Sequence, residues 1–137
     1  MGIIVDTCIW IDVERGRISP ADIQLFTRDE PIFLTPVTIA ELAFGVGMAT
    51  NDQIRNQRAA ALERLKKKPM LTIDEETGAV FGHVSSALRR QGRGADFRVQ
   101  DIWIASQAIQ HNFPILTRNL KDFEDIPGVR LMPLIRQ

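Results

Sequence analysis

Ile3-Ile4-Val5-Asp6-Thr7 is the stretch of sequence that decides the fold. Three β-branched residues followed by an acid and a threonine predict a short buried strand that ends in a turn. Similar apolar runs follow at Ile32-Phe33-Leu34, Met70-Leu71-Thr72-Ile73 and Pro114-Ile115-Leu116-Thr117, and a short terminal strand is expected at Val129-Arg130-Leu131. Short, uniformly apolar strands are typical of a sheet that is buried on both faces.

Helical patterns separate these strands. We expect helices over Cys8 to Arg15, from Ser19-Pro20 to about Thr27, from Thr35-Pro36 onward, from Asn51 to about Lys68, from Asp74 to near Gly92, and from Val99 to His111. Strands that alternate with helices indicate parallel βαβ units. The sequence therefore predicts an α/β fold, in which a central, mostly parallel sheet of four to five strands lies between two helical layers. We expect residues 1–137 to form a single domain.

Composition excludes several classes of protein. The chain has 137 residues, 45% of them hydrophobic and 25% charged, which is ordinary for a soluble globular protein. Its net charge is zero, which argues against a protein that coats nucleic acid nonspecifically but permits an RNA substrate. No apolar run approaches the roughly 20 residues of a membrane span. Cys8 is the only cysteine, which suits a reducing compartment, so we expect a cytoplasmic protein without a membrane partner.

Acidic residues stand beside the ends of several predicted strands. Asp6 follows the first strand, Glu41 lies on the helix after the second, Asp101 begins the helix before Pro114, and Asn119 and Asp122 follow the strand after it. In open parallel sheets, sites form beyond the carboxyl ends of the strands, so these side chains should converge. Carboxylates that converge usually hold a cation, and oxygen ligands favour Mg²⁺ or Mn²⁺. The pattern predicts a metal-dependent enzyme.

Taken together and in this order, these motifs resemble those of the PIN-domain ribonucleases, specifically the bacterial VapC-type toxins and their FitB-like relatives. The resemblance runs from Ile3 to about Leu134. It rests on the opening hydrophobic-Asp-Thr, a Glu-Leu after a Thr-rich helix start, Asp-x-x-Ile-Ala from Asp101, and Thr-Arg-Asn-x-x-Asp-Phe from Thr117. It implies a compact α/β/α PIN domain that acts as a Mg²⁺- or Mn²⁺-dependent endoribonuclease, the toxin of a type II toxin–antitoxin system. It also implies a homodimer that a VapB-type antitoxin neutralises.

The resemblance also assigns roles to individual residues. Its metal ligands fall on Asp6, Glu41 and Asp101, with Glu41 also able to hold the attacking water. The fourth catalytic position is left open between Asn119, which stands where many relatives have an acid, and Asp122. Asp122 could instead cap a short helix after it. Other residues are expected to position the RNA or the carboxylates, through hydroxyl groups or positive charge: Thr7, Thr117, Arg93, Arg98, Arg118 and Lys121.

Two other functions remain open. The chain could be a non-catalytic PIN-like partner of a DNA-binding antitoxin in operon regulation, or a structure-specific nuclease. Apolar side chains beyond the needs of one small core are expected to be covered by a partner: Trp10, Phe44, Val46, Met48 and Phe81.

Simpler interpretations apply to several residues. We expect Cys8 to be a buried structural thiol, and we expect His83 and His111 to serve packing or the surface rather than zinc. Asp96 is expected to cap, and Asp125 to be a solvated charge.

Overall fold

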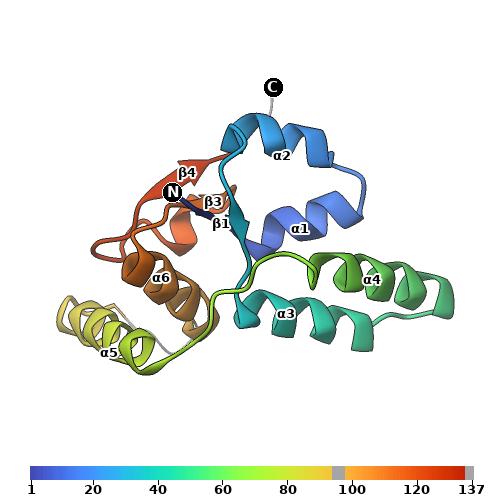
Figure 1. Ribbon diagram of the computed structural model, residues 1–137. Coiled ribbons are helices and arrows are strands. Elements are labelled where there is room, and N and C mark those ends of the chain that lie inside the picture. The colour runs from blue at the N-terminus through green and yellow to red at the C-terminus, as the bar shows by residue number, and fades with distance from the viewer. Residues whose placement is uncertain (94–97, 135–137) are drawn as a thin grey trace.

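A computed structural model describes residues 1–93 and 98–134 of the chain (Figure 1). In these residues a single sheet contains four strands, which are β1 (Ile3–Val5), β2 (Ile32–Phe33), β3 (Ile115–Thr117) and β4 (Leu131–Pro133). Their order is β2-β1-β3-β4, and all neighbouring pairs are parallel. The predicted parallel sheet is confirmed, with four strands where four to five were expected.

Within the described residues, six helices connect these strands. They are α1 (Thr7–Glu14), α2 (Pro20–Thr27), α3 (Pro36–Gly47), α4 (Asp52–Leu65), α5 (Glu75–Arg90) and α6 (Val99–His111), with a 3₁₀ turn η1 at Leu120–Asp122. The capping residues that the sequence suggested do begin these helices: the side chains of Ser19, Thr35, Asn51 and Asp74 each accept a hydrogen bond from the backbone of the following first turn. The predicted bounds of the helix over Val99 to His111 are confirmed.

The sheet is buried on both faces, as its uniformly apolar strands predict. On one face, Ile4 and Ile115 pack against α5 and α6 in a cluster that includes Leu88 and Ile102. On the other face, Ile3, Val5 and Leu116 pack with residues of α1 and α2 such as Ile9 and Ile23. Figure 1 shows the two helical groups on opposite sides of the strands. The three-layer α/β/α architecture is confirmed.

The expected strand at Met70 to Ile73 is wrong. A single bridge joins Met70 to Leu34, next to β2, and the residues after it form no ladder. The Gln107 side chain of α6 donates hydrogen bonds to the carbonyls of Leu71 at 2.9 Å and Thr72 at 3.2 Å. A buried amide from the helical layer therefore satisfies carbonyl groups that a further strand would have used.

The strand order locates the functional edge of the sheet. From β1 the chain crosses to β2 on one side, while β3 pairs with the other side of β1. The carboxyl ends of β1 and β3 therefore flank a topological switch point, where open α/β sheets place their ligands. No helix in the described residues is long and apolar enough to cross a membrane.

Candidate active site

Asp6 lies at the centre of the switch point, directly after β1, and caps the N-terminus of α1. Its side chain is buried and accepts three hydrogen bonds: from the Thr7 backbone N–H at 2.8 Å, the Thr117 hydroxyl at 2.8 Å and the Cys8 thiol at 3.2 Å. Burial raises the pKa of Asp6 above its ordinary value, and these hydrogen bonds offset that rise only in part. The negative charge of Asp122 raises the pKa further. The hydrogen bonds thus fix the orientation of the Asp6 carboxylate, and a nearby positive charge would stabilise its ionised form.

Glu41 reaches the same edge from α3. Its Oε1 accepts a hydrogen bond from the Thr7 hydroxyl at 2.9 Å, and that hydroxyl also lies 3.0 Å from the hydroxyl of Thr38. Burial raises the pKa of Glu41, the Thr7 hydrogen bond lowers it, and repulsion by Asp6 raises it. The Thr7 hydroxyl therefore binds Glu41, while the Thr7 backbone N–H binds Asp6.

Asp101 enters the site from the first turn of α6. Its pKa is raised to about 7, first by burial and then by the negative charges of Asp122, Asp6 and Glu41. Arg98 lowers the pKa but does not cancel the repulsion. Repulsion from all three other acids means that the four carboxylates share one region at the edge of the sheet.

Asn119 and Asp122 belong to the segment that follows β3. The Asn119 backbone N–H donates to the Thr117 hydroxyl oxygen at 3.0 Å, and the Asn119 carbonyl accepts from the Asp122 N–H at 3.1 Å. Asp122 is the last residue of η1, so the alternative in which it caps a helix after it is wrong. The fully buried ring of Phe123 anchors the segment in the core. Asp122 interacts electrostatically with both Asp6 and Asp101, which places it among the acids.

Two of the arginines expected to contact RNA are instead paired with an acid of the same chain. Arg98 binds both carboxylate oxygens of Asp125, each at 2.7 Å, and Arg93 reaches Asp125 Oδ2 at 3.2 Å. The side chain of Asp125 is only 12% exposed, so the expectation that it is a solvated charge is wrong. Its pKa is lowered, chiefly by the hydrogen bonds from Arg98.

Arg118 is also engaged within the chain. Its Nε lies 2.7 Å from Oδ2 of Asp12, a carboxylate on α1 that is only 1% exposed. Arg17 adds a longer contact to Asp12 at 3.5 Å. Sequence reasoning missed Asp12, and the available signal was an acid at a core-facing position of a short apolar helix. Lys121, the remaining cation expected to position RNA, is exposed, as Arg93 and Arg118 are.

The chemistry of these donors fits a hard divalent cation. The converging groups are carboxylate oxygens with hydroxyl neighbours, and the pKa values of Asp6, Glu41 and Asp101 are all raised, as expected for acids gathered without a compensating charge. However, within residues 1–93 and 98–134 no group of three or more His, Cys, Asp or Glu side chains is placed to hold a metal ion. The acids are therefore close enough to repel one another, but their oxygens are not arranged to coordinate an ion. Their role as metal ligands stays a prediction.

The remaining expectations divide. Cys8 is half-buried rather than buried. His83 and His111 are both exposed, and the ring of His111 stacks on Phe113, which agrees with surface and packing roles. The predicted cap at Asp96 lies outside the described residues.

Comparison with known proteins agrees with this fold. A family model described as "PIN domain" matches residues 3–129, so the chain belongs to the PIN-domain family. It is 32% identical over 133 residues to "Ribonuclease VapC" of Rickettsia bellii, covering 96% of each chain. It is also 32% identical to "Ribonuclease VapC5" of Mycobacterium tuberculosis, covering 97% of this chain and 93% of the relative. The crystal structure of VapBC-5, a toxin–antitoxin system of that organism, superposes with a TM-score of 0.75 at 26% identity over 97% of this chain and 98% of the other.

Proposed function

We propose that this protein is the toxin of a type II toxin–antitoxin system and acts as a Mg²⁺- or Mn²⁺-dependent endoribonuclease. The observation that carries the proposal is the meeting of Asp6, Glu41, Asp101 and Asp122 at the switch point of the sheet. Membership of the PIN family and relatives named as VapC ribonucleases support it.

The residues divide the work of phosphodiester hydrolysis. Asp6, Glu41 and Asp101 would hold the metal, and Asn119 or Asp122 would complete the set. A bound Mg²⁺ or Mn²⁺ would supply stabilisation of negative charge on the attacked phosphate and a water of lowered pKa.

The hydroxyl neighbours give these carboxylates their orientation. Thr117 fixes Oδ2 of Asp6 and the Thr7 backbone N–H fixes its Oδ1, while the Thr7 hydroxyl fixes Oε1 of Glu41. Hydrogen bonds of this kind hold a charged ligand in one direction before its partner arrives. Glu41, half-buried beside Asp6, is placed to accept a hydrogen bond from the attacking water.

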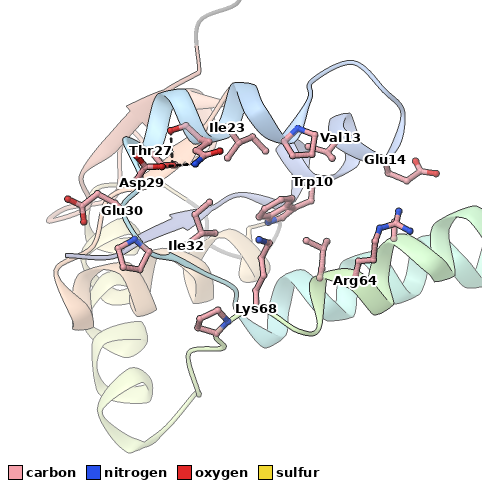
Figure 2. A pocket seen from close by; sticks show the side chains of 16 residues that line it. Trp10, Val13, Glu14, Ile23, Thr27, Asp29, Glu30, Ile32, Arg64 and Lys68 are labelled. Carbon is pink, nitrogen blue, oxygen red and sulfur yellow. Dashed lines mark hydrogen bonds between the residues drawn. The ribbon is translucent and has the colours of Figure 1, made fainter.

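We assign the antitoxin to an apolar pocket of about 750 Å³ between α1, α2 and α4 (Figure 2). Trp10 stands in the middle of it with Ile23 and Val13 beside the ring, and Lys68 Nζ lies 5.7 Å from the ring centroid. Trp10 Nε1 is buried without a hydrogen-bond partner in the described part of the chain. A buried indole N–H without a partner costs free energy in the free protein.

The rim of this pocket suits a segment that carries both charge types. Glu14, Asp29 and Glu30 line it together with Arg64 and Lys68. An antitoxin tail with apolar anchors could fill the pocket, and a cationic residue further along it could pair with Asp6, Glu41 or Asp101. Such a tail would become ordered on binding, in exchange for a large contact area.

Three further features belong to the proposal. We expect residues 1–137 to act as one PIN domain, the protein to be a homodimer, and the site of action to be the cytoplasm. Phe44 on α3 and Met48, the residue that caps its C-terminus, lie one turn apart and are 70% and 62% exposed, which supports a covered face there.

The test is cleavage of RNA by purified protein free of antitoxin, with Mn²⁺, with Mg²⁺ and with chelator. We expect metal-dependent cleavage that Asp6→Asn and Asp101→Asn lower by at least about 100-fold, since each removes a proposed ligand. Glu63→Gln on α4 is the matched control, because it removes an exposed carboxylate away from the site.

Two results would favour the alternatives. Normal antitoxin and operator binding without any RNA cleavage would favour the regulatory partner. Cleavage confined to flapped duplexes or single-stranded DNA would favour a structure-specific nuclease.

A further inference from the structure

Arg98 connects two parts of the acidic site that are distant in sequence. It is the residue that precedes α6, and its carbonyl accepts a hydrogen bond from the Ile102 N–H at 2.9 Å. Its side chain crosses to the segment after η1, where both terminal nitrogens bind Asp125 at 2.7 Å. One of these nitrogens also donates to the backbone carbonyl of Asp122.

Each end of this connection carries an acid of the site. Asp101 lies three residues after Arg98, in the first turn of α6. Asp122 is the residue whose backbone carbonyl accepts a hydrogen bond from Arg98. Asp101 and Asp122 repel one another, and without an opposing tie this repulsion would drive the start of α6 away from the η1 segment.

The geometry of the tie is unusually restrictive. A guanidinium that binds both oxygens of one carboxylate fixes direction as well as distance, which a lysine cannot do. The side chains of Arg98 and Asp125 are only 20% and 12% exposed, so the pair is poorly screened by water.

We infer that Arg98 and Asp125 form a positioning pair that holds Asp101 and Asp122 at their working separation, and that Arg98 does not act as an RNA contact. This inference rests on the proposed function of the acidic site. Two terminal nitrogens of Arg98 are committed to the protein, whereas a residue that binds RNA phosphate needs them free. Arg93 differs, because it is 59% exposed and reaches one oxygen of Asp125 at 3.2 Å.

The variants Arg98→Gln, Arg98→Lys, Asp125→Asn and the double variant Arg98→Gln/Asp125→Asn test the inference. Arg55→Gln is the matched control, because Arg55 also pairs with an aspartate, Asp52 at 2.6 Å, but lies on α4. Three quantities are measured for each: kcat and KM for a short RNA, the Kd for Mn²⁺ by calorimetry, and the midpoint of thermal unfolding.

We expect Arg98→Gln and Asp125→Asn each to lower kcat by roughly 10–100-fold and to weaken Mn²⁺ binding, as loss of a residue that orients metal ligands does. The KM for RNA should stay within about twofold of the wild-type value, and the double variant should be no worse than the weaker single variant, because both substitutions break one interaction. Arg98→Lys should recover part of the loss, and Arg55→Gln, which breaks an arginine–aspartate pair on α4 away from the site, should resemble wild type.

Two results would overturn the inference, and a third would separate it from the proposed function. A raised KM in Arg98→Gln with normal kinetics in Asp125→Asn would make Arg98 an RNA contact. A lowered unfolding midpoint with unchanged kcat and Mn²⁺ affinity would make the pair purely structural. If wild type cleaves no RNA while Asp125→Asn still weakens Mn²⁺ binding, the proposed function fails and the positioning pair stands.

Discussion

The Thr117 hydroxyl donates a hydrogen bond to Asp6 Oδ2 at 2.8 Å and accepts one from the Asn119 backbone N–H at 3.0 Å. One hydroxyl thus joins the first acidic motif of the chain to the last. Replacing Thr117 with Val keeps the shape of the side chain but removes this hydrogen-bonding group. We expect kcat for RNA cleavage to fall by roughly 10–100-fold, because Asp6 loses a fixed direction and the Asn119 N–H loses its acceptor.

Thr117→Ser is the control for that change, since it retains the hydroxyl and should keep kcat within a few fold of wild type. If Thr117→Val and Thr117→Ser were equally active, the hydroxyl would have no part in orienting Asp6.

Asp101 makes stability depend on pH. Its pKa is raised from 3.8 to about 7, so the folded protein binds this proton more tightly than the unfolded chain does. The favourable contribution is therefore fully present below about pH 4 and is lost as the pH rises to about 7. In Asp101→Asn this dependence disappears, and we expect the variant to be more stable than wild type by about 1–2 kcal/mol at pH 8, after discounting for solvent screening.

Thermal unfolding in chelator between pH 5 and pH 8 measures this difference. Because Asp6 and Glu41 also have raised pKa values, the informative quantity is the gap between wild type and Asp101→Asn, not the slope of either curve. A constant gap across the range would show that Asp101 titrates normally.

The strands, helices and acids could be predicted from sequence because each depends on local patterns. Ile3 to Val5 is a β-branched run that pairs in the middle of the sheet, and the acid directly after it necessarily lies at the carboxyl edge. The start of α6 could be placed in the same way, and Asp101 with it.

The roles of the arginines could not be predicted in this way. Positive charge at Arg98 and Arg118 is evident in the sequence, but their partners Asp125 and Asp12 lie 27 and 106 positions away. Only the folded arrangement decides whether such a cation faces solvent or a buried carboxylate. The prediction of a strand at Met70 to Ile73 failed for a related reason, because the distant Gln107 side chain of α6 binds a carbonyl of this segment.

Asp12 should matter for stability through Arg118. Arg118→Gln leaves the Asp12 carboxylate, 1% exposed, without its 2.7 Å partner. We expect the free energy of unfolding to fall by about 2 kcal/mol, since a hydrogen bond to a charged group is lost and the arginine was partly solvated. Chemical denaturation measures this loss, with Lys66→Gln as the surface control expected to cost less than about 1 kcal/mol. Equal costs for the two variants would show that the Asp12–Arg118 pair contributes no more than a surface pair.

Cys8 should be unreactive in the folded protein. Burial and the neighbouring Asp6 carboxylate raise the pKa of its thiol to about 12, so very little of the reactive thiolate is present at neutral pH. We expect alkylation by iodoacetamide at pH 8 to be slow in native protein and fast in denaturant. Cys8→Ser should retain activity, because its hydroxyl can still donate to Asp6 Oδ2. Cys8→Ala, which has no donor, should be less active than Cys8→Ser. Rapid native alkylation would mean that the thiol is more accessible than its half-buried position indicates.

The exposed face of α3 provides the test of the proposed homodimer. Phe44 and Met48 are separated by one helical turn, so they form one apolar surface. A glutamate in place of Phe44 would bury a charge in any interface formed there, which costs far more free energy than the lost contact alone. We expect Phe44→Glu to be monomeric by light scattering at micromolar concentration with its fold intact. The matched control is Leu25→Glu on α2, since Leu25 is 77% exposed and lies on a different helix. If Leu25→Glu were monomeric and Phe44→Glu dimeric, the interface would lie on α2 instead. If the wild-type protein were monomeric, the proposed homodimer would be wrong.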